Sequence, residues 1–420
     1  MLFDKEQNYI RYRTCKAFCG SICFYICRLF PIDKKLISVC TFEGKGGFGC
    51  NPKYIVQELH RRDPSLKFVW FVNDMAKEFP PYIRKVPNTL WSRAFWLSRS
   101  KVWIDNYRKP YGTRKRRGQF YVNTWHGELG FKTIGLWRGK AFSQIARFVS
   151  ENDSRMIDIV PIESIWGRNV YPKGLLYKGS FLMSGSPRCD IIFGDRSQVR
   201  TAFRERHGLA PDSKVVMFAP TYRETSRNGR RSVMSKLWSL DFGRLLRNLS
   251  AKFGGEWKLC MRLHPQLAAD MDFSTTVAGI KILDVSRDDD MYEDLAAMDA
   301  FVTDFSSAAF DASLCRIPVF IYADDLDSYK DDRGELEWEL SSSHTEEVWN
   351  KADVTPGFRT VLPYSVAQDN DGLEQAIAGF DTSLYEEKLQ RFESDIELLF
   401  DGKGSARVAD VIEQTIGANA

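Results

Sequence analysis

The chain lacks a long apolar run. It has 420 residues, of which 44% are hydrophobic, but no stretch reaches the roughly 18 to 20 uninterrupted apolar residues that cross a bilayer. The N-terminus also lacks the basic start, apolar run and small-residue cleavage site of a secretory signal, because Asp4, Lys5 and Glu6 stand there. These absences predict a cytoplasmic protein.

Cysteine and net charge are also limited. The nine cysteines follow no familiar disulfide spacing, which predicts free thiols in a reducing compartment. The formal net charge is only +4, and residues 1–40 alone carry seven Lys/Arg against three Asp/Glu. The rest of the chain is therefore neutral overall, and the composition does not indicate a nucleic-acid-binding protein.

Nucleotide and metal signatures are missing as well. Gly44–Gly49 is rich in glycine, but it has neither a Gly-Lys-Ser/Thr ending nor G-x-G-x-x-G spacing. The stretch is either a plain turn or a flexible loop that brings Lys45 to an acceptor. The acidic runs 288–290 and 324–332 are typical of solvated loops. The sequence therefore predicts no metal site.

The N-terminal arm, residues 1–34, is basic and amphipathic. Its longest apolar stretch, Ala17–Phe30, is interrupted by Arg28. Such a segment either lies on an anionic membrane surface or packs as an ordinary helix on the protein's own body. A cysteine recurs every four residues, which is typical of a small apolar helix face and not of a tetrahedral metal site. The flanking cations are Arg11, Arg13, Lys16, Lys34 and Lys35, and the cysteines are Cys15, Cys19, Cys23 and Cys27.

Apolar strands alternate with helical segments along most of the chain, which predicts an α/β fold with parallel sheets. We expect two β/α domains facing a cleft, over residues 35–207 and 208–382, followed by C-terminal helices within 383–420. The predicted strands are 35–42, 67–72, 101–104, 119–124, 215–219, 257–263, 281–284, 300–303 and 319–322. The predicted helices are 52–61, 195–207, 383–399 and 405–416.

The segment Asn123–Glu128 (NTWHGE) follows a predicted strand. In open α/β sheets, ligands bind beyond the carboxyl ends of the strands. His126 stands there beside a glycine, and an imidazole that titrates near neutrality suits general-base catalysis. With only five histidines in the chain, His126 is the candidate catalytic base, and the alternative is a structural loop histidine.

Other clusters follow strands of the second predicted domain. Thr303 ends a strand, and Ser306 or Ser307 then begins a helix, whose unpaired amide groups attract anions. Arg223 follows another strand, and Arg262 and His264 follow the next. These cations either neutralise a diphosphate or form interdomain ion pairs.

Two basic features belong to the first predicted domain. Arg188 lies in a Gly/Pro turn near the domain junction. Residues 108–118 carry six basic groups and no acid, a composition that suits an anionic polymer or lipid headgroups.

Taken in order, these clusters resemble the CDP-glycerol glycerophosphotransferases of teichoic acid and capsule polymer synthesis. The resemblance covers about residues 36–345. It runs through FEGKGGFGCNPKYIVQEL, FVWFVND, SKVWIDN, NTWHGELGFKTIG, SGSPRCDI, FAPTYRE, RLHP, MDAFVTDFSSAAFD and PVFIYADDLDSYKDDRGE.

This resemblance implies a GT-B-like fold of two Rossmann-type domains, with the donor nucleotide mainly on the second. It implies transfer of glycerol phosphate from CDP-glycerol to a hydroxyl of a cell-surface polymer or its lipid-linked precursor, releasing CMP at the inner face of the membrane. It implies that no metal or other cofactor is obligatory. His126 would be the base, and the donor phosphates would be held by Arg262, His264, Thr303, Ser306, Ser307, Arg223 and Arg333.

One departure from the family concerns the acceptor side. After Trp-His-Gly the family commonly continues Thr-Pro-Leu-Lys, whereas this chain reads Glu128-Leu129-Gly130-Phe131-Lys132. Glu128 is expected to orient His126 or to recognise the acceptor together with Lys45 and Arg188. Three alternatives stay open: a CDP-ribitol phosphotransferase, a nucleotide-sugar glycosyltransferase of the same fold, and a non-catalytic membrane-surface scaffold.

Overall fold

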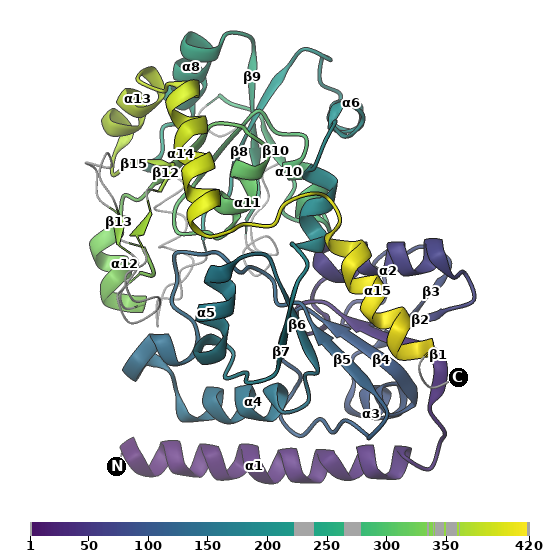
Figure 1. Cartoon of the computed structure of the whole chain (residues 1–420). Coiled ribbons are helices and arrows are strands. Elements are labelled where there is room, and N and C mark those ends of the chain that lie inside the picture. Colours follow the sequence, from purple (N-terminus) through teal and green to yellow (C-terminus); the bar gives the residue numbers. More distant parts are fainter. Residues whose placement is uncertain are drawn as a thin grey trace. The chain divides into compact units, whose positions relative to one another are not determined.

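The structure of the protein is a computed structural model that divides into two compact units. It describes residues 2–221, 239–263, 279–333, 336–338, 340, 348–349, 359–360 and 362–417. The N-terminal unit comprises Met1–Glu128, Ile134–Asp190 and Leu399–Ala420, and the C-terminal unit comprises Leu129–Thr133 and Ile191–Leu398. Figure 1 shows the elements of both.

The N-terminal unit is built on a seven-stranded parallel sheet with the order β3-β2-β1-β4-β5-β6-β7. Its first six strands have the order 3-2-1-4-5-6 of a doubly wound Rossmann sheet. The order reverses between β1 and β4, where Val39 pairs with both Trp70 and Ile104. The strands are β1 (Asp33–Cys40), β2 (Lys67–Val72), β3 (Ile83–Pro87), β4 (Ser100–Asp105), β5 (Phe120–Asn123), β6 (Ile159–Ile162) and β7 (Ser180–Met183).

Helices cover this sheet because its strands are apolar on both faces, as in KFVWFV of β2, where all but the first residue is buried. Val408, Ala409 and Ile412 of the C-terminal helix join the core between the sheet and α2. The helical elements are α1 (Leu2–Cys27), η1 (Phe42–Gly44), α2 (Cys50–Arg62), α3 (Leu90–Arg99), η2 (Gly135–Ala141), α4 (Gln144–Ser154), α5 (Ile165–Gly174), η3 (Pro187–Ile192) and α15 (Gly404–Gly417).

The C-terminal unit repeats the same plan with a six-stranded parallel sheet of order β10-β9-β8-β11-β12-β15. Here the order reverses between β8 and β11. The strands are β8 (Lys214–Phe218), β9 (Trp257–Met261), β10 (Ile282–Asp284), β11 (Ala300–Thr303), β12 (Val319–Tyr322) and β15 (Ser365–Ala367), with a separate antiparallel pair, β13 (Val348–Trp349) and β14 (Arg359–Thr360).

The helices of the C-terminal unit complete its core. Phe242, Leu245 and Leu249 of α8 pack with the sheet and with Leu373 and Ile377 of α13. The helices are α6 (Ser197–Arg206), α8 (Phe242–Phe253), α10 (Met291–Leu295), α11 (Ala308–Leu314), α12 (Leu326–Arg333), α13 (Asn370–Ala378) and α14 (Thr382–Asp395).

The predicted elements are confirmed. Strands 67–72, 300–303 and 319–322 have the predicted bounds. Every other predicted strand or helix agrees to within two residues at each end, except that α14 ends at Asp395, four residues before its predicted end. The two C-terminal helices belong to different units: α14 is part of the C-terminal unit, and α15 is part of the N-terminal unit. The short strands β3, β6, β7 and β15 were not predicted.

Helix α1 packs on the N-terminal unit along one side. Phe24 and Cys27 are buried, the Ser21 hydroxyl donates to Gly112 O at 3.0 Å, and Ser98 Oγ of α3 donates to Phe24 O at 3.4 Å. The packed-helix interpretation is therefore correct for this side. None of the helices in the described part of the chain combines the length and hydrophobicity that a membrane span requires.

The cysteines of α1 divide between its two sides. Cys23 and Cys27 are buried, whereas Cys15 and Cys19 are exposed, so the predicted cysteine stripe drifts from the surface into the interior. All nine cysteines lie in the described residues and are free thiols, as predicted.

Candidate functional site

His126 lies at the carboxyl edge of the N-terminal sheet, just after β5. Its Nδ1 is 2.8 Å from the backbone oxygen of Asn106, which follows the neighbouring strand β4. Because a carbonyl oxygen can only accept, Nδ1 carries the proton, and in the neutral ring Nε2 is left with the lone pair. This tautomer is the one that a general base needs in order to take a proton from a substrate hydroxyl.

Aromatic rings hold the imidazole of His126 in place. Tyr107 stacks on it, with ring centres 5.3 Å apart and an interplanar angle of 20°. The indole of Trp125 lies 4.5 Å away, and Phe42 presents an edge at 5.5 Å. The faces of such rings attract cations, so this surrounding stabilises the imidazolium that forms once the base has accepted a proton.

Backbone strain gathers around the same ring. Trp125 has a φ of 50°, and the consecutive residues Phe42 and Glu43 have φ values of 47° and 57°. Residues with side chains rarely adopt this left-handed region, which costs on the order of 1 to 3 kcal/mol each and is typical of functional sites. The strain and the ring contacts together mark the surroundings of His126 as the functional centre of the N-terminal unit.

A network of buried polar groups, centred on Asn123, holds the His126 loop in place. Asn123 accepts a hydrogen bond from the Trp125 amide at 2.9 Å and donates to Tyr107 O at 3.2 Å. Its amide nitrogen also donates to Asp153 at 3.2 Å. Asn123 thus connects the residue before His126 to the residue that stacks on it.

Asp153 is buried and is surrounded by donors. It accepts from Lys109 N at 3.0 Å and from the Tyr121 hydroxyl at 3.2 Å. Burial raises the pKa of its carboxyl to about 7. Nearby, the Lys109 ammonium forms a buried ion pair with Asp105 at 2.7 Å, so that the network contains two acids and one cation in a water-excluded place.

The side chain of Glu128 forms hydrogen bonds within its own unit. Its carboxylate accepts from Glu163 N at 2.7 Å, from the Ser164 hydroxyl and from Gly167 N at 3.2 Å, at the start of α5. A Cβ on Gly167 would lie 2.1 Å from the carboxyl carbon of Glu128. The described contacts therefore place the Glu128 carboxyl at the N-terminus of α5, where two backbone amides and a hydroxyl donate to it. Its predicted acceptor-side role stays a prediction.

We expect Glu128 to make stability depend on pH. Burial raises the pKa of its carboxyl to about 7, above the value of 4.5 that it has when unfolded. Its stabilising contribution is therefore complete below pH 4.5 and is lost as the pH rises through 7. Relative to wild type, Glu128→Gln should gain on the order of 3 kcal/mol in free energy of unfolding between pH 4.5 and pH 8, measured by urea titration.

The exposed Glu78 of the same unit provides the control. Glu78→Gln should follow the wild-type stability curve throughout. A constant difference between wild type and Glu128→Gln across this pH range would contradict the assignment of a raised pKa to Glu128.

Lys45 and Arg188, the other predicted acceptor-side residues, lie in different surroundings. Lys45 is exposed, and its amide donates to Phe42 O at 3.0 Å in the strained turn after β1. Arg188 is buried, and its amide donates to Asn51 Oδ1 at 3.0 Å. Asn51 in turn donates to Trp125 O at 3.2 Å, so η3, which carries Arg188, is linked to the His126 loop through one asparagine.

Most of the cations in residues 108–118 form contacts inside the N-terminal unit. Lys115 pairs with Asp158, Arg116 donates to Phe30 O at 2.7 Å, and Arg114 donates to Asn152 at 2.8 Å. With Lys109 already paired, four of the six cations serve the fold. These four cations are therefore engaged within the fold, and the binding of a polymer or lipid by this segment stays a prediction for its remaining cations, Arg108 and Arg117.

In the C-terminal unit, Thr303 ends β11, at the point where the strand order reverses, and Ser306 and Ser307 follow this strand. The Thr303 hydroxyl is buried and donates to Ala219 O at 2.6 Å. Ser306 and Ser307 are half-buried, and Ser306 Oγ accepts from Ala308 N at 3.3 Å. Asp304 fastens this turn to the end of β8, because it accepts from both the amide and the hydroxyl of Thr221 at 2.8 and 2.6 Å.

The side chain of Arg262 binds groups within the C-terminal unit. Its guanidinium donates to Val285 O and Asp288 O, each at 2.8 Å, and pairs with Asp294 at 3.2 Å. Burial raises the pKa of Asp294 to about 7. Arg223 and His264 lie outside the described residues, and Arg333 ends α12 without a described side chain.

The short segment Leu129–Thr133, directly after the His126 loop, belongs to the C-terminal unit. Phe131 is fully buried there, 5.0 Å from the ring of Phe310, and its carbonyl accepts from Glu337 N at 2.7 Å. A Cβ on Gly130 would lie 3.4 Å from that of Ser307.

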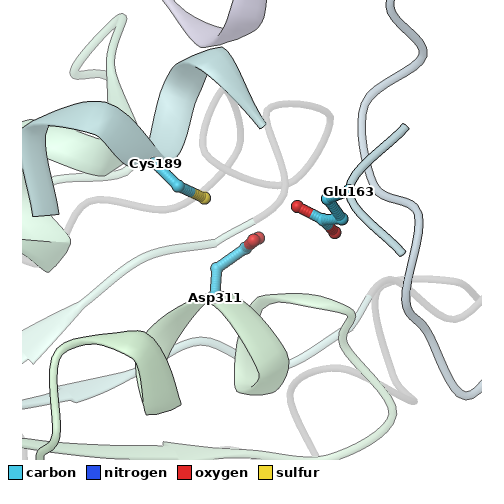
Figure 2. A group of neighbouring side chains, drawn as sticks. All are labelled: Glu163, Cys189 and Asp311. Carbon is cyan, nitrogen blue, oxygen red and sulfur yellow. The ribbon is translucent and has the colours of Figure 1, made fainter. Parts of the chain in front are cut away.

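Figure 2 labels three buried side chains that carry metal-binding atoms, Glu163, Cys189 and Asp311. Glu163 follows β6 and Cys189 lies in η3 of the N-terminal unit, whereas Asp311 lies in α11 of the C-terminal unit. Within its own unit, Asp311 accepts from the Tyr292 hydroxyl at 2.7 Å. Because its members come from different units, the group carries no metal assignment.

Sequence reasoning missed the residues that surround His126. These are Asn106 and Tyr107 after β4, Phe42 after β1, and Asn123 at the end of β5. The signal was available in the rule that ligands meet the carboxyl ends of strands on both sides of the reversal in strand order. The segment SKVWIDN is part of the family resemblance, yet the two residues after its strand received no role.

Comparison with known proteins identifies the family of the chain. The profile of the CDP-glycerol:poly(glycerophosphate) glycerophosphotransferase family matches residues 22–341. A teichoic acid poly(glycerol phosphate) polymerase of Bacillus spizizenii is 26% identical over 341 residues, 78% of this chain and 83% of that protein. A teichoic acid poly(ribitol-phosphate) polymerase of the same species is 26% identical over 419 residues, 97% of this chain and 61% of that protein.

The chain spans about half the length of some curated relatives, such as a poly(glycerol phosphate) polymerase of Staphylococcus epidermidis, of which it covers 51%. Among solved structures, that of the wall teichoic acid polymerase TagF matches with a TM-score of 0.75 at 21% identity, over 98% of both chains. This likeness confirms the predicted GT-B-like fold. Because the family profile covers most of the chain, the protein belongs to the CDP-glycerol:poly(glycerophosphate) glycerophosphotransferase family.

Proposed function

We propose that the protein transfers glycerol phosphate from CDP-glycerol to a hydroxyl of a cell-surface polymer or its lipid-linked precursor. The observation that carries this proposal is the fixed tautomer of His126, whose Nδ1 donates to Asn106 O at 2.8 Å. A base held in this way, in a chain of this family, suits the deprotonation of an acceptor hydroxyl. The product is a polymer of the teichoic acid or capsule type, longer by one unit.

In the proposed step, Nε2 of His126 takes the proton of the acceptor hydroxyl as its oxygen attacks the phosphorus that carries glycerol. A new oxygen–phosphorus bond forms, the bond from that phosphorus to the oxygen of CMP breaks, and CMP leaves with the electron pair. The imidazolium then returns its proton to solvent or to the leaving group. Most of the rate acceleration comes from positioning and from neutralising charge on the phosphates.

On the donor side, we assign phosphate contacts to Ser306 and Ser307, whose half-buried hydroxyls follow β11. Thr303 and Arg262 are given a supporting role, because their polar groups are bound to the unit's own backbone and to Asp294. Arg223, His264 and Arg333 stay assigned to the donor phosphates by family resemblance. No obligatory metal is included in this scheme.

A panel of donors tests the proposed function. CDP-glycerol, CDP-ribitol, a UDP-sugar and a CMP-sugar would each be supplied with membrane extract as the source of acceptor. We expect nucleotide release that depends on acceptor with CDP-glycerol and that persists in EDTA. CDP-ribitol is the second candidate because a ribitol-phosphate polymerase is among the relatives, and turnover with CDP-ribitol alone would replace the donor that we propose. Loss of activity in EDTA would contradict the metal-free scheme.

We further propose that the protein works at the inner face of the cell membrane, with α1 as its contact. The side of α1 opposite the packed one exposes large apolar residues, and Leu29, in the turn directly after the helix, is 86% exposed. Exposed cations lie along the same helix, among them Arg11 and Lys16. An apolar stripe with basic flanks suits the surface of an anionic bilayer. The other exposed apolar residues are Tyr9, Tyr12, Phe18, Ile22, Tyr25, Ile26 and Phe30.

Vesicle flotation measures this contact. Replacing Ile22, Ile26 and Leu29 together with serine should lower binding to vesicles containing phosphatidylglycerol by about tenfold or more, because burial of each aliphatic side chain contributes on the order of 1 kcal/mol. Vesicles of phosphatidylcholine alone should bind the wild type more weakly. The control Leu384→Ser changes a residue of α14 that is 49% exposed. Equal binding by the triple variant and the wild type would refute the contact.

A further inference from the structure

Two arginines beside the His126 loop have no anionic partner in the described part of the chain. Arg108 follows the pair Asn106 and Tyr107, and Arg138 lies in η2. Both side chains are half-buried. Four other cations of the 108–118 segment form internal ion pairs or hydrogen bonds, as described above. Arg108 differs from them because no ion pair is formed by its guanidinium within the described residues.

The position of Arg108 is fixed by an aromatic face. Its guanidinium carbon lies 4.8 Å from the centre of the Trp125 indole, and the same indole lies 4.5 Å from the imidazole of His126. One nitrogen also donates to Gly174 O, at the end of α5, at 3.4 Å. The guanidinium is thus held one ring away from the candidate base, with its remaining donors available.

Tight packing brings η2, and with it Arg138, to the same end of α5. A Cβ on Gly135 would lie 2.0 Å from Gly174 O, the oxygen that Arg108 contacts. Trp137 of η2 donates to Val170 O of α5 at 3.0 Å. The charge of Arg138 is close enough to lower the pKa of Arg108, beside the larger effect of burial.

The nearest acids do not neutralise these two cations. Asp153 and Glu43 both act on the charge of Arg108, but neither forms an ion pair with it within the described residues. Asp153 is already occupied by Lys109 N, Tyr121 and Asn123. Two like charges held close together repel each other, and an anion that binds between them relieves this repulsion.

We propose that Arg108 and Arg138 form a subsite for an anionic phosphodiester of the acceptor chain. The inference rests on the proposed function, in which His126 deprotonates the terminal hydroxyl of a polymer that carries a phosphate in each repeat. In such a repeat the terminal oxygen and the phosphorus are on the order of 6 Å apart, the reach of about five single bonds. Planar guanidinium groups bind phosphate through paired hydrogen bonds.

The subsite explains how the protein distinguishes a growing polymer from a free alditol. A hydroxyl whose neighbouring phosphate is held by Arg108 and Arg138 is positioned at Nε2 of His126, whereas a neutral polyol lacks this anchor. The subsite belongs wholly to the N-terminal unit. It therefore acts on the acceptor and not on the binding of CDP-glycerol.

The test compares two acceptors of equal length. One ends in glycerol joined through a phosphodiester, and in the other a methylphosphonate, which is neutral and of similar shape, replaces that phosphodiester. We expect wild type to show a KM for the charged acceptor that is about 10- to 100-fold lower, the range of a charge-assisted contact. Arg138→Gln should remove most of this preference, with kcat at saturating acceptor and the KM for CDP-glycerol unchanged.

Arg117→Gln serves as the matched control, because Arg117 is an exposed cation at the far end of the same segment. Arg108→Lys keeps the charge but not the planar fork, and should lose part of the preference. If Arg138→Gln and Arg108→Lys both prefer the charged acceptor as strongly as wild type does, the subsite is refuted.

A direct binding measurement separates the subsite from the proposed function. A glycerol phosphate oligomer would be titrated into the full chain by calorimetry, without donor. Binding by wild type that weakens tenfold in Arg138→Gln would support the subsite even if CDP-glycerol gave no turnover, a result that would contradict only the proposed donor. Equal binding by the two proteins would overturn the subsite.

Discussion

Replacing His126 with alanine is expected to lower kcat for acceptor-dependent release of CMP by about 10²- to 10⁴-fold, the range that a general base contributes. The donor should still bind with an unchanged KM, because its proposed contacts lie in the C-terminal unit. The rate would be measured with purified protein, CDP-glycerol and a glycerol phosphate acceptor.

His60 is the control for this substitution. It belongs to the same unit and lies in the last turn of α2. Its ring stacks on Tyr82, with ring centres 3.8 Å apart. His60→Ala should keep the wild-type rate. A His126→Ala protein that folds and turns over like wild type would exclude His126 as the base.

Replacing Asn123 with aspartate is expected to lower kcat at least tenfold through the position of His126. The new carboxylate can still accept from the Trp125 amide, but it cannot donate to Tyr107 O and it faces Asp153, which the native amide contacts at 3.2 Å. Repulsion between two buried acids displaces the loop. The effect should fall on kcat and not on the KM for CDP-glycerol, and steady-state kinetics measures both.

A second substitution separates positioning from general destabilisation. Asp153→Asn, added to Asn123→Asp, restores one donor and removes the repulsion, and should recover part of kcat. The buried amide of Gln119, just before the other end of β5, donates to Leu97 O and Ser100 O at 2.5 and 2.6 Å. Gln119→Leu should lower stability with little change in kcat. If it lowers kcat as strongly as Asn123→Asp does, the positioning role is refuted.

The sequence was sufficient for the fold because the central strands are continuous apolar runs. KFVWFV, AFVT and VFIY have the bounds predicted for them, since parallel strands covered on both faces need apolar residues throughout. The strands of the two parallel sheets that escaped prediction are three to five residues long, and two of them contain proline: IRKVP and IVPI. Such short runs become strands only through pairing with neighbours already in the sheet.

The site was predictable in its chemistry but not in its supports. His126 could be named because an imidazole after a strand has few structural uses, whereas its partner Asn106 acts through a backbone carbonyl that sequence does not display. The helix-terminus contacts of Glu128 escaped prediction for the opposite reason. Its proximity to His126 in sequence favoured a shared role, but the chain turns so that the carboxylate meets the start of α5.

The cations show the same limit. Residues 108–118 form a continuous basic run in sequence, yet in the structure Lys109, Arg114, Lys115 and Arg116 hold the unit together. Arg262 likewise pairs with Asp294 instead of standing open. A count of charges along the chain does not distinguish a cation that has found an internal partner from one that has not.

The most direct test of the proposed function is the identity of the bond that breaks. Purified protein would be given CDP-glycerol and a glycerol phosphate acceptor, and the nucleotide product and the mass of the extended acceptor would be measured together. We predict CMP, released in an amount equal to the glycerol phosphate units added. Release of CDP with transfer of glycerol alone, or no acceptor-dependent turnover, would contradict the proposed phosphotransfer.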